Sequence, residues 1–186
     1  MDYGPAYLDT AGLDGVAACL EGIAYAGGES FTVGPAGGGP VPKRTLAPGS
    51  YGNVTVRRGA ELHLTGSGTF YFDSFDLDSG GKLFLNVSDP TTGFIRIFVK
   101  GQLRFQGQQN GNVLASRALL GWTKNTSQPS VSINQSLRMT ILAPKGEIVL
   151  EPGWLWAGSG YANRIELHQD SRFSYNKYYD AGAMCP

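Results

Sequence analysis

The sequence predicts an all-β protein, folded as a single-stranded β-solenoid (β-helix) with an N-terminal capping α-helix. Three observations support this fold class. Short apolar runs place hydrophobic side chains at every second position, which is the period of a strand with one buried face. Glycine supplies 27 of the 186 residues, about twice its usual share of roughly 7%, and many glycines lie between those runs. The runs also recur at intervals of 21 to 28 residues, as the coils of a solenoid do.

The composition fits a single domain over residues 1–186. Hydrophobic residues make up 41% of the chain and charged residues 16%, which is enough for a buried core and atypical of disorder. Lysine and arginine (15) balance aspartate and glutamate (15). Without net charge, the protein is not expected to bind nucleic acid or an anionic membrane. No apolar run approaches the roughly 20 residues of a membrane helix, so no membrane-spanning segment is expected.

Residues 2–26 form the one convincing helical stretch. Apolar residues recur there at steps of three and four, the period of a helix: Leu13, Val16, Leu20 and Ile23. Two glycines at 27 and 28 end the pattern. The helix is expected to place its apolar stripe over the open end of the first coil. Because a signal-peptide pattern is missing here, we expect that a signal or anchor was removed and that Met1 was added.

The solenoid itself is expected to span residues 46–175. A glycine- and proline-rich segment at 34–42 reads as a linker or surface loop, after a possible short strand at 31–33, and residues 176–186 form a tail. One series of inward-facing pairs is Val54/Val56, Phe75/Leu77, Leu103/Phe105, Ile148/Leu150 and Phe173/Tyr175. A second series is Phe70/Phe72, Ile97/Val99, Ile141/Ala143 and Ile165/Leu167.

Both series contain one interval of double length, which covers residues 106–138. Possible strands at 118–123 and 130–134 lie inside it. Each coil would contain two or three short strands and bury its inward side chains by stacking on its neighbours. A β-sandwich remains the alternative, because it also places turn signals between short strands.

One group of segments carries a resemblance to known proteins: 46–52, 68–72 with Leu77, 97–101, and above all Met139 to Pro144 with Ile165 to His168 and Tyr175. These segments resemble the β-solenoid domains of uncharacterised bacterial exported and pilus-associated proteins. The resemblance covers residues 46–175 and implies a β-helical module on the outside of a cell or in the periplasm. It supplies no catalytic residues. The helix at 2–26 and the tail lie outside it.

The densest aromatic group consists of Trp154, Trp156 and Tyr161. If the alternation holds, the two indoles share one face, and on an exposed strand they would form a flat apolar platform for sugar rings. The alternative is that these rings fill the last coils of the core.

Three acidic residues, Asp73, Asp76 and Asp78, offer oxygen atoms at short spacing, as a calcium site would. The segment lacks the twelve-residue pattern of an EF-hand and its final glutamate. Acidic side chains that face solvent and blunt a strand edge are the favoured interpretation. No cofactor is expected, and calcium is the one metal considered.

Basic residues could form a stripe on the outer face of the strands: Arg57, Arg58, Arg96, Lys100 and Arg104. Such a stripe is suited to binding an acidic polysaccharide, or to a lyase that acts on one with a carboxylate and calcium. Outward charges that keep strand edges from aggregating are the simpler interpretation.

Histidine and cysteine side chains are few. His63 and His168 each follow an apolar residue of a strand and should point outward, His168 beside Glu166; no set of three or four zinc ligands is visible. Cys19 and Cys185 lie near opposite ends of the chain. A disulfide between them would indicate an oxidising compartment, and two unrelated thiols are the alternative.

Three functions follow from these patterns. The first is a non-catalytic, extracellular or periplasmic structural or adhesive module of a bacterial surface assembly. The second is a carbohydrate-binding module that uses Trp154, Trp156 and Tyr161. The third is a polysaccharide lyase or hydrolase, although no catalytic residue can be named. The expected partner is therefore a cell-surface protein assembly or a polysaccharide, and the protein is not expected to be an enzyme.

Overall fold

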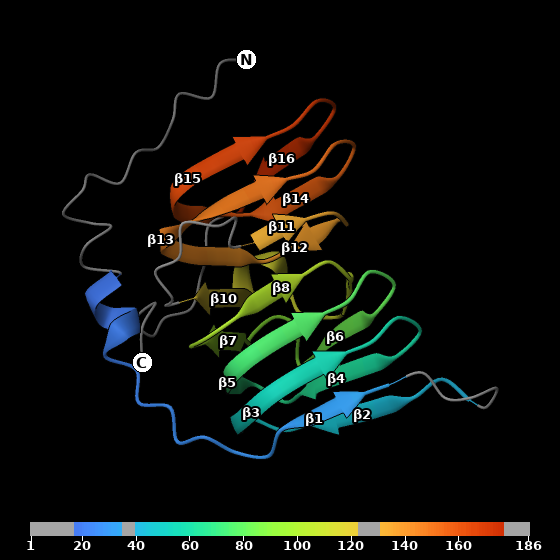
Figure 1. Ribbon diagram of the computed structural model, residues 1–186. Coiled ribbons are helices and arrows are strands. Elements are labelled where there is room, and N and C mark those ends of the chain that lie inside the picture. The colour runs from blue at the N-terminus through green and yellow to red at the C-terminus, as the bar shows by residue number, and fades with distance from the viewer. Residues whose placement is uncertain (1–16, 35–39, 123–130, 177–186) are drawn as a thin grey trace.

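The chain forms a parallel β-solenoid of about six turns (Figure 1). The computed structural model describes residues 17–34, 40–122 and 131–176. Successive coils stack along one axis, and every pairing between the described strands is parallel. This confirms the predicted solenoid. It excludes the β-sandwich, because neighbouring strands of a sandwich sheet run antiparallel.

The strands belong to three sheets that follow the solenoid axis. The largest contains β1 (Phe31–Val33), β3 (Gly49–Val56), β5 (Gly68–Leu77), β7 (Ile95–Val99), β8 (Leu103–Phe105), β10 (Ala118–Trp122), β11 (Val131–Ile133), β13 (Thr140–Leu150) and β15 (Gly160–Leu167). The second contains β2 (Lys43–Leu46), β4 (Glu61–Thr65), β6 (Lys82–Asn86) and β9 (Gln108–Gly111). The third contains β12 (Leu137–Arg138), β14 (Leu155–Gly158) and β16 (Arg172–Tyr175). A 3-10 turn, η1 (Ala115–Arg117), precedes β10.

Each coil presents three strand segments in turn. One segment is a strand of a small sheet. The other two lie in the large sheet, either as the halves of one long strand, as in β5, or as two separate strands, as in β7 and β8. The two halves of β5 illustrate this, because the first pairs with β7 and the second with the separate strand β8. Two to three short strands per coil were predicted, and the structure confirms that number.

The register places the inward side chains of successive coils directly above one another. Val54 pairs with Phe75, and Phe75 pairs with Leu103. Phe70 likewise pairs with Ile97. All five side chains are buried in one cluster that runs along the axis. Each coil therefore completes its core only through the coils above and below it.

The interval of double length contains one further coil. Its strands β10 and β11 confirm the two possible strands predicted there. Leu120 pairs with Ile97 on one side and with Ile141 on the other, and Val131 pairs with Ile148. These residues supply the missing member of each inward series.

The last members of the two series were assigned to the wrong sides of the coil. Ile165 pairs with Ile148, so it continues the series that begins at Val54. Phe173 pairs with Trp156 in the third sheet. The step between coils shortens to 17 residues in this region, whereas the prediction extended the longer steps of the earlier coils. Ile165 and Phe173 therefore each lie one side of the coil away from the predicted position.

An N-terminal helix is present, but it is shorter than predicted. Within the described part of the chain it covers residues 17–21. It ends at Glu21 and not near residue 26, because the chain turns at Gly22 and continues without regular secondary structure up to β1. Residues 2–16 of the predicted helix lie outside the described residues.

The helix also lies at a different place from the predicted one. Leu20 is buried against Phe98, Leu119 and Leu142, which point outward from β7, β10 and β13. The apolar side of the helix therefore packs on the flank of the middle coils (Figure 1) and not over the open first coil. Beyond the helix, Tyr25 meets the Tyr71 ring edge-on at a centroid distance of 5.9 Å.

The glycine- and proline-rich segment is not a boundary of the solenoid. β1 and β2 lie on either side of it, and they pair with β3 and β4. The solenoid thus begins before residue 46, with β1 and β2. Residues 35–39 of this segment and residues 177–186 of the predicted tail lie outside the described residues. The single-domain assignment stays a prediction.

Candidate functional site

The three aromatic residues proposed as a sugar platform do not share a surface. The Trp156 side chain is only 1% exposed, and its indole N–H donates a hydrogen bond of 2.9 Å to the Met139 carbonyl. Trp154 is half-buried against the same core cluster. Tyr161 lies in the outward-facing cluster around Leu142. The structure excludes an exposed pair of indoles, because Trp156 points into the core, and it bears out for Trp156 the interpretation that these rings fill the last coils of the core.

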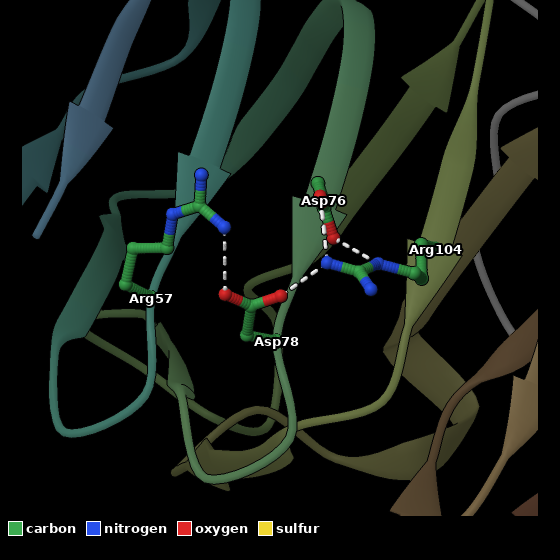
Figure 2. A network of polar contacts seen from close by, with 4 residues as sticks. All are labelled: Arg57, Asp76, Asp78 and Arg104. Carbon is green, nitrogen blue, oxygen red and sulfur yellow. Dashed lines mark hydrogen bonds and ion pairs between the residues drawn. The ribbon is translucent and has the colours of Figure 1, made fainter.

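Two of the three acidic residues bind arginine side chains (Figure 2). Asp76 accepts hydrogen bonds from Arg104 Nε at 2.6 Å and from Arg104 Nη2 at 2.9 Å. Asp78 also binds Arg104 Nη2, and it accepts a 3.2 Å hydrogen bond from Arg57 Nη1. Hydrogen bonding to Asp76 raises the pKa of Arg104 above its ordinary value. We call these four residues the arginine–aspartate network.

This network connects three successive coils. Arg57 follows β3, Asp76 lies in β5 and Asp78 directly follows it, and Arg104 lies in β8. Asp76 and Arg104 are paired by the strand register, which is the reason that the two charges meet. Charge-assisted, bidentate hydrogen bonds of this kind are stronger than neutral ones. The network therefore fastens neighbouring coils to one another on their outer face.

The network also argues against calcium at Asp73, Asp76 and Asp78. A calcium ion there would have to displace the guanidinium group of Arg104 from both carboxylates. In residues 17–34, 40–122 and 131–176, no three or more histidine, cysteine, aspartate or glutamate side chains are grouped to hold a metal ion. Asp73 takes no part in the network, and its backbone carbonyl accepts the Gly101 N–H at 2.7 Å.

The basic residues do not act as one free cationic stripe. Arg57 and Arg104 belong to the arginine–aspartate network. The Arg96 guanidinium lies over the Phe94 ring, 4.6 Å from its centroid, and Lys100 Nζ lies 5.8 Å from the centroid of Tyr25. These contacts favour the interpretation that the basic side chains stabilise the outer surface.

Removing the guanidinium group of Arg104 is expected to weaken the solenoid. A double-mutant cycle compares the wild-type protein, Arg104→Gln, Asp76→Asn and the double variant. The coupling free energy between the two side chains should be about 1 kcal/mol, the upper range for a partly exposed ion pair. Chemical denaturation of the four proteins measures it. Arg58→Gln is the matched control, since Arg58 lies beside Arg57 but outside the network. Additive single effects would show that the contact adds nothing.

The two histidines occupy outward positions, as predicted. His63 stacks on Phe84 with a centroid distance of 4.3 Å, and its Nε2 lies 3.2 Å from Glu61 Oε2. Lys82 Nζ lies 3.4 Å from Glu61 Oε1. Hydrogen bonding to His63, with a smaller contribution from Lys82, lowers the pKa of Glu61 below its ordinary value of 4.5.

The lowered pKa of Glu61 predicts a pH dependence. A carboxyl whose pKa is lower in the folded than in the unfolded state stabilises the fold above the unfolded value. That contribution is lost as the pH falls through the folded pKa, which lies below 4.5. Glu61→Gln should therefore be less stable than the wild-type protein at pH 7 and equally stable near the acid end of the titration. A constant difference across a urea denaturation series from pH 7 down to acid would contradict this.

A second polar network lies on the last coils, and the sequence predicted only its contact between His168 and Glu166. Arg164 binds Glu147 at 3.0 Å and Glu166 at 2.9 Å. His168 Nε2 lies 3.0 Å from Glu166 Oε1, and its Nδ1 lies 3.6 Å from Glu151 Oε2. The predicted proximity of His168 and Glu166 is confirmed. The contact between Glu147 and Arg164 could have been predicted from the strand register, which pairs these two residues.

The last coil exposes side chains that are inward-facing in the other coils. Four large apolar residues at this end are exposed: Ile165 (44%), Leu167 (53%), Phe173 (44%) and Tyr175 (63%). Ile165 and Leu167 lie above Ile148 and Leu150, both of which are buried. We call these four residues the C-terminal apolar end.

Cys19 is disulfide-bonded. Its predicted partner, Cys185, lies outside the described residues. The sequence contains these two cysteines and no others. Because Cys185 is outside the described residues, its pairing with Cys19 stays a prediction.

Comparison with family models, curated proteins and solved structures found no match to this chain. The β-solenoid implied by the resemblance is confirmed by the fold itself. The family named in that resemblance stays an expectation. Within the described ranges, no helix has the length and apolar character that crossing a membrane requires.

Proposed function

We propose that this chain is a non-catalytic structural or adhesive module of a bacterial cell-surface assembly, placed outside the cell or in the periplasm. The observation that supports a structural role is the arginine–aspartate network, whose ionic side chains fasten three coils together. A stack of coils that is joined on its outer face as well as through its core resists local unfolding.

A row of hydrogen-bonded polar side chains, Ser30, Asn53 and Ser74, supports the same role. Ser30 Oγ accepts a 2.8 Å hydrogen bond from the Asn53 backbone N–H. Ser74 Oγ donates a 2.7 Å hydrogen bond to Asn53 Oδ1. These contacts again join three successive levels of the solenoid along its outer surface.

The other two functions receive less support. A carbohydrate-binding platform loses one of its two indoles, because Trp156 is in the core. A lyase needs a free basic side chain beside the substrate, whereas Arg104 is held by two carboxylates. The disulfide at Cys19 favours an oxidising compartment such as the cell exterior or the periplasm.

The location can be tested in the source bacterium. An epitope-tagged chain should appear in the surface or periplasmic fraction, or be digested by protease added to intact cells. A chain that fractionates with the cytosol and resists external protease would contradict the proposal. A glycan array supplies the second test: binding that is lost in both Trp154→Ala and Tyr161→Ala would favour the carbohydrate-binding module instead.

A further inference from the structure

The C-terminal apolar end is exposed where the other coils are covered. Inward-facing side chains normally meet the next coil, and here no further coil follows in the described residues. The backbone edges of β15 and β16 are likewise paired only on the side of β13 and β14 in the described part of the chain. Free strand edges beside exposed apolar side chains are a favourable site for pairing with another chain.

The opposite end of the solenoid is covered differently. Val33 of β1 and Leu46 of β2 point inward and are buried. The Arg44 guanidinium lies over the Phe31 ring, 3.6 Å from its centroid, and binds Glu29. A charged group therefore covers this end. A head-to-tail stack would bring this charged group against the C-terminal apolar end, which favours pairing of two apolar ends instead.

We propose that the C-terminal ends of two copies of this chain pair about a twofold axis, with β15 antiparallel to β15 of the partner. The pattern of charge along β15 fits such a pairing. With the axis at Ile165, Arg164 lies opposite the partner's Glu166, and Glu166 lies opposite the partner's Arg164. Each copy thus supplies one member of each of two equivalent ion pairs, as a twofold interface requires.

The same axis matches large side chains to small ones. The twofold axis passes through the second half of β15, so the three strand segments of the partner's last coil follow in the reverse order. As a result, β16 lies over the first half of the partner's β15. Phe173 and Tyr175 then face the partner's Gly160 and Ala162, and Ile165 faces the partner's Ile165. Antiparallel pairing would also satisfy the free backbone edges. The inference goes beyond the proposed function, because it concerns the partner of this end in any compartment.

The first test is the oligomeric state of the full chain. Sedimentation equilibrium should give a dimer at micromolar concentrations, and Leu167→Lys or Tyr175→Lys should convert it to a monomer with an unchanged circular dichroism spectrum. Leu114→Lys and Val41→Lys are matched controls, because these residues are exposed apolar positions elsewhere (41% and 56%), and both variants should remain dimeric. A wild-type monomer at high micromolar concentration would overturn the proposal.

The second test addresses the register. Arg164→Glu and Glu166→Arg should each raise the dimer dissociation constant on the order of a hundredfold, because like charges then face each other twice. A mixture of the two variants should form a heterodimer, in which both cross-chain pairs are again opposite in charge. Contacts within one chain cannot produce this rescue. Variants that stay dimeric alone, or a mixture that stays monomeric, would overturn the twofold pairing at Ile165.

Discussion

Replacing Trp156 with alanine is expected to lower the free energy of unfolding by about 3–5 kcal/mol, the range for removing a large aromatic side chain from a core. The indole is almost fully buried and hydrogen-bonded to Met139. It also packs edge-on against Phe173, with a centroid distance of 4.9 Å. The surrounding backbone fits closely, since a Cβ at Gly160 would lie 2.2 Å from the ring. Alanine would therefore leave a cavity and an unpaired Met139 carbonyl.

Trp154→Ala is the matched control for this prediction, because Trp154 is two residues away and only half-buried. The free energy of unfolding should fall by clearly less in this variant, about 1–2 kcal/mol, because the Trp154 side chain buries less apolar surface than that of Trp156. Guanidinium denaturation followed by far-UV circular dichroism measures both. Equal losses for the two variants would show that Trp156 is not the more buried ring. They would also favour a surface that both indoles share.

The inward-facing core could be predicted from the sequence because two simple constraints fix it. Period-two alternation separates inward from outward residues within a strand, and a recurring interval relates one coil to the next. Val54, Phe75 and Leu103 satisfy both constraints, and they are stacked as expected. Where the interval changed, as between Trp156 and Phe173, the same reasoning failed because the step is set by turn length and not by the core.

The outward-facing contacts are set by the same register as the inward ones, but period-two alternation does not give an outward residue a particular partner. Asp76 and Arg104 directly follow Phe75 and Leu103, so they meet once those two residues are aligned. The outer side of β7, on which the N-terminal helix packs, could also be recognised from the sequence. Ile97, Phe98 and Val99 are consecutive apolar residues and are all buried, as expected of a strand covered on both faces. Which segment covers Phe98 depends on long-range packing, and this is why the helix was placed at the wrong site.

Replacing Gly111 with alanine is expected to destabilise the solenoid by about 3 kcal/mol or more, from backbone strain and a steric clash together. Gly111 ends β9 with a φ of +116°, which L-residues rarely adopt. A Cβ there would lie 2.1 Å from the Leu85 carbonyl oxygen and 2.6 Å from the Leu85 backbone nitrogen. Leu85 is the residue with which Gly111 pairs in the coil below. The clash can be relieved only if the two coils move apart.

Gly153→Ala separates the two causes. Gly153 also has a positive φ, +79°, but an added Cβ would meet no atom within 4 Å. This variant should lose only the conformational term, about 1 kcal/mol. The difference between the two variants then measures how tightly neighbouring coils approach at Gly111. If both variants lost the same amount in thermal and chemical denaturation, close backbone stacking of β9 on β6 would be refuted, because the steric term depends on that contact alone.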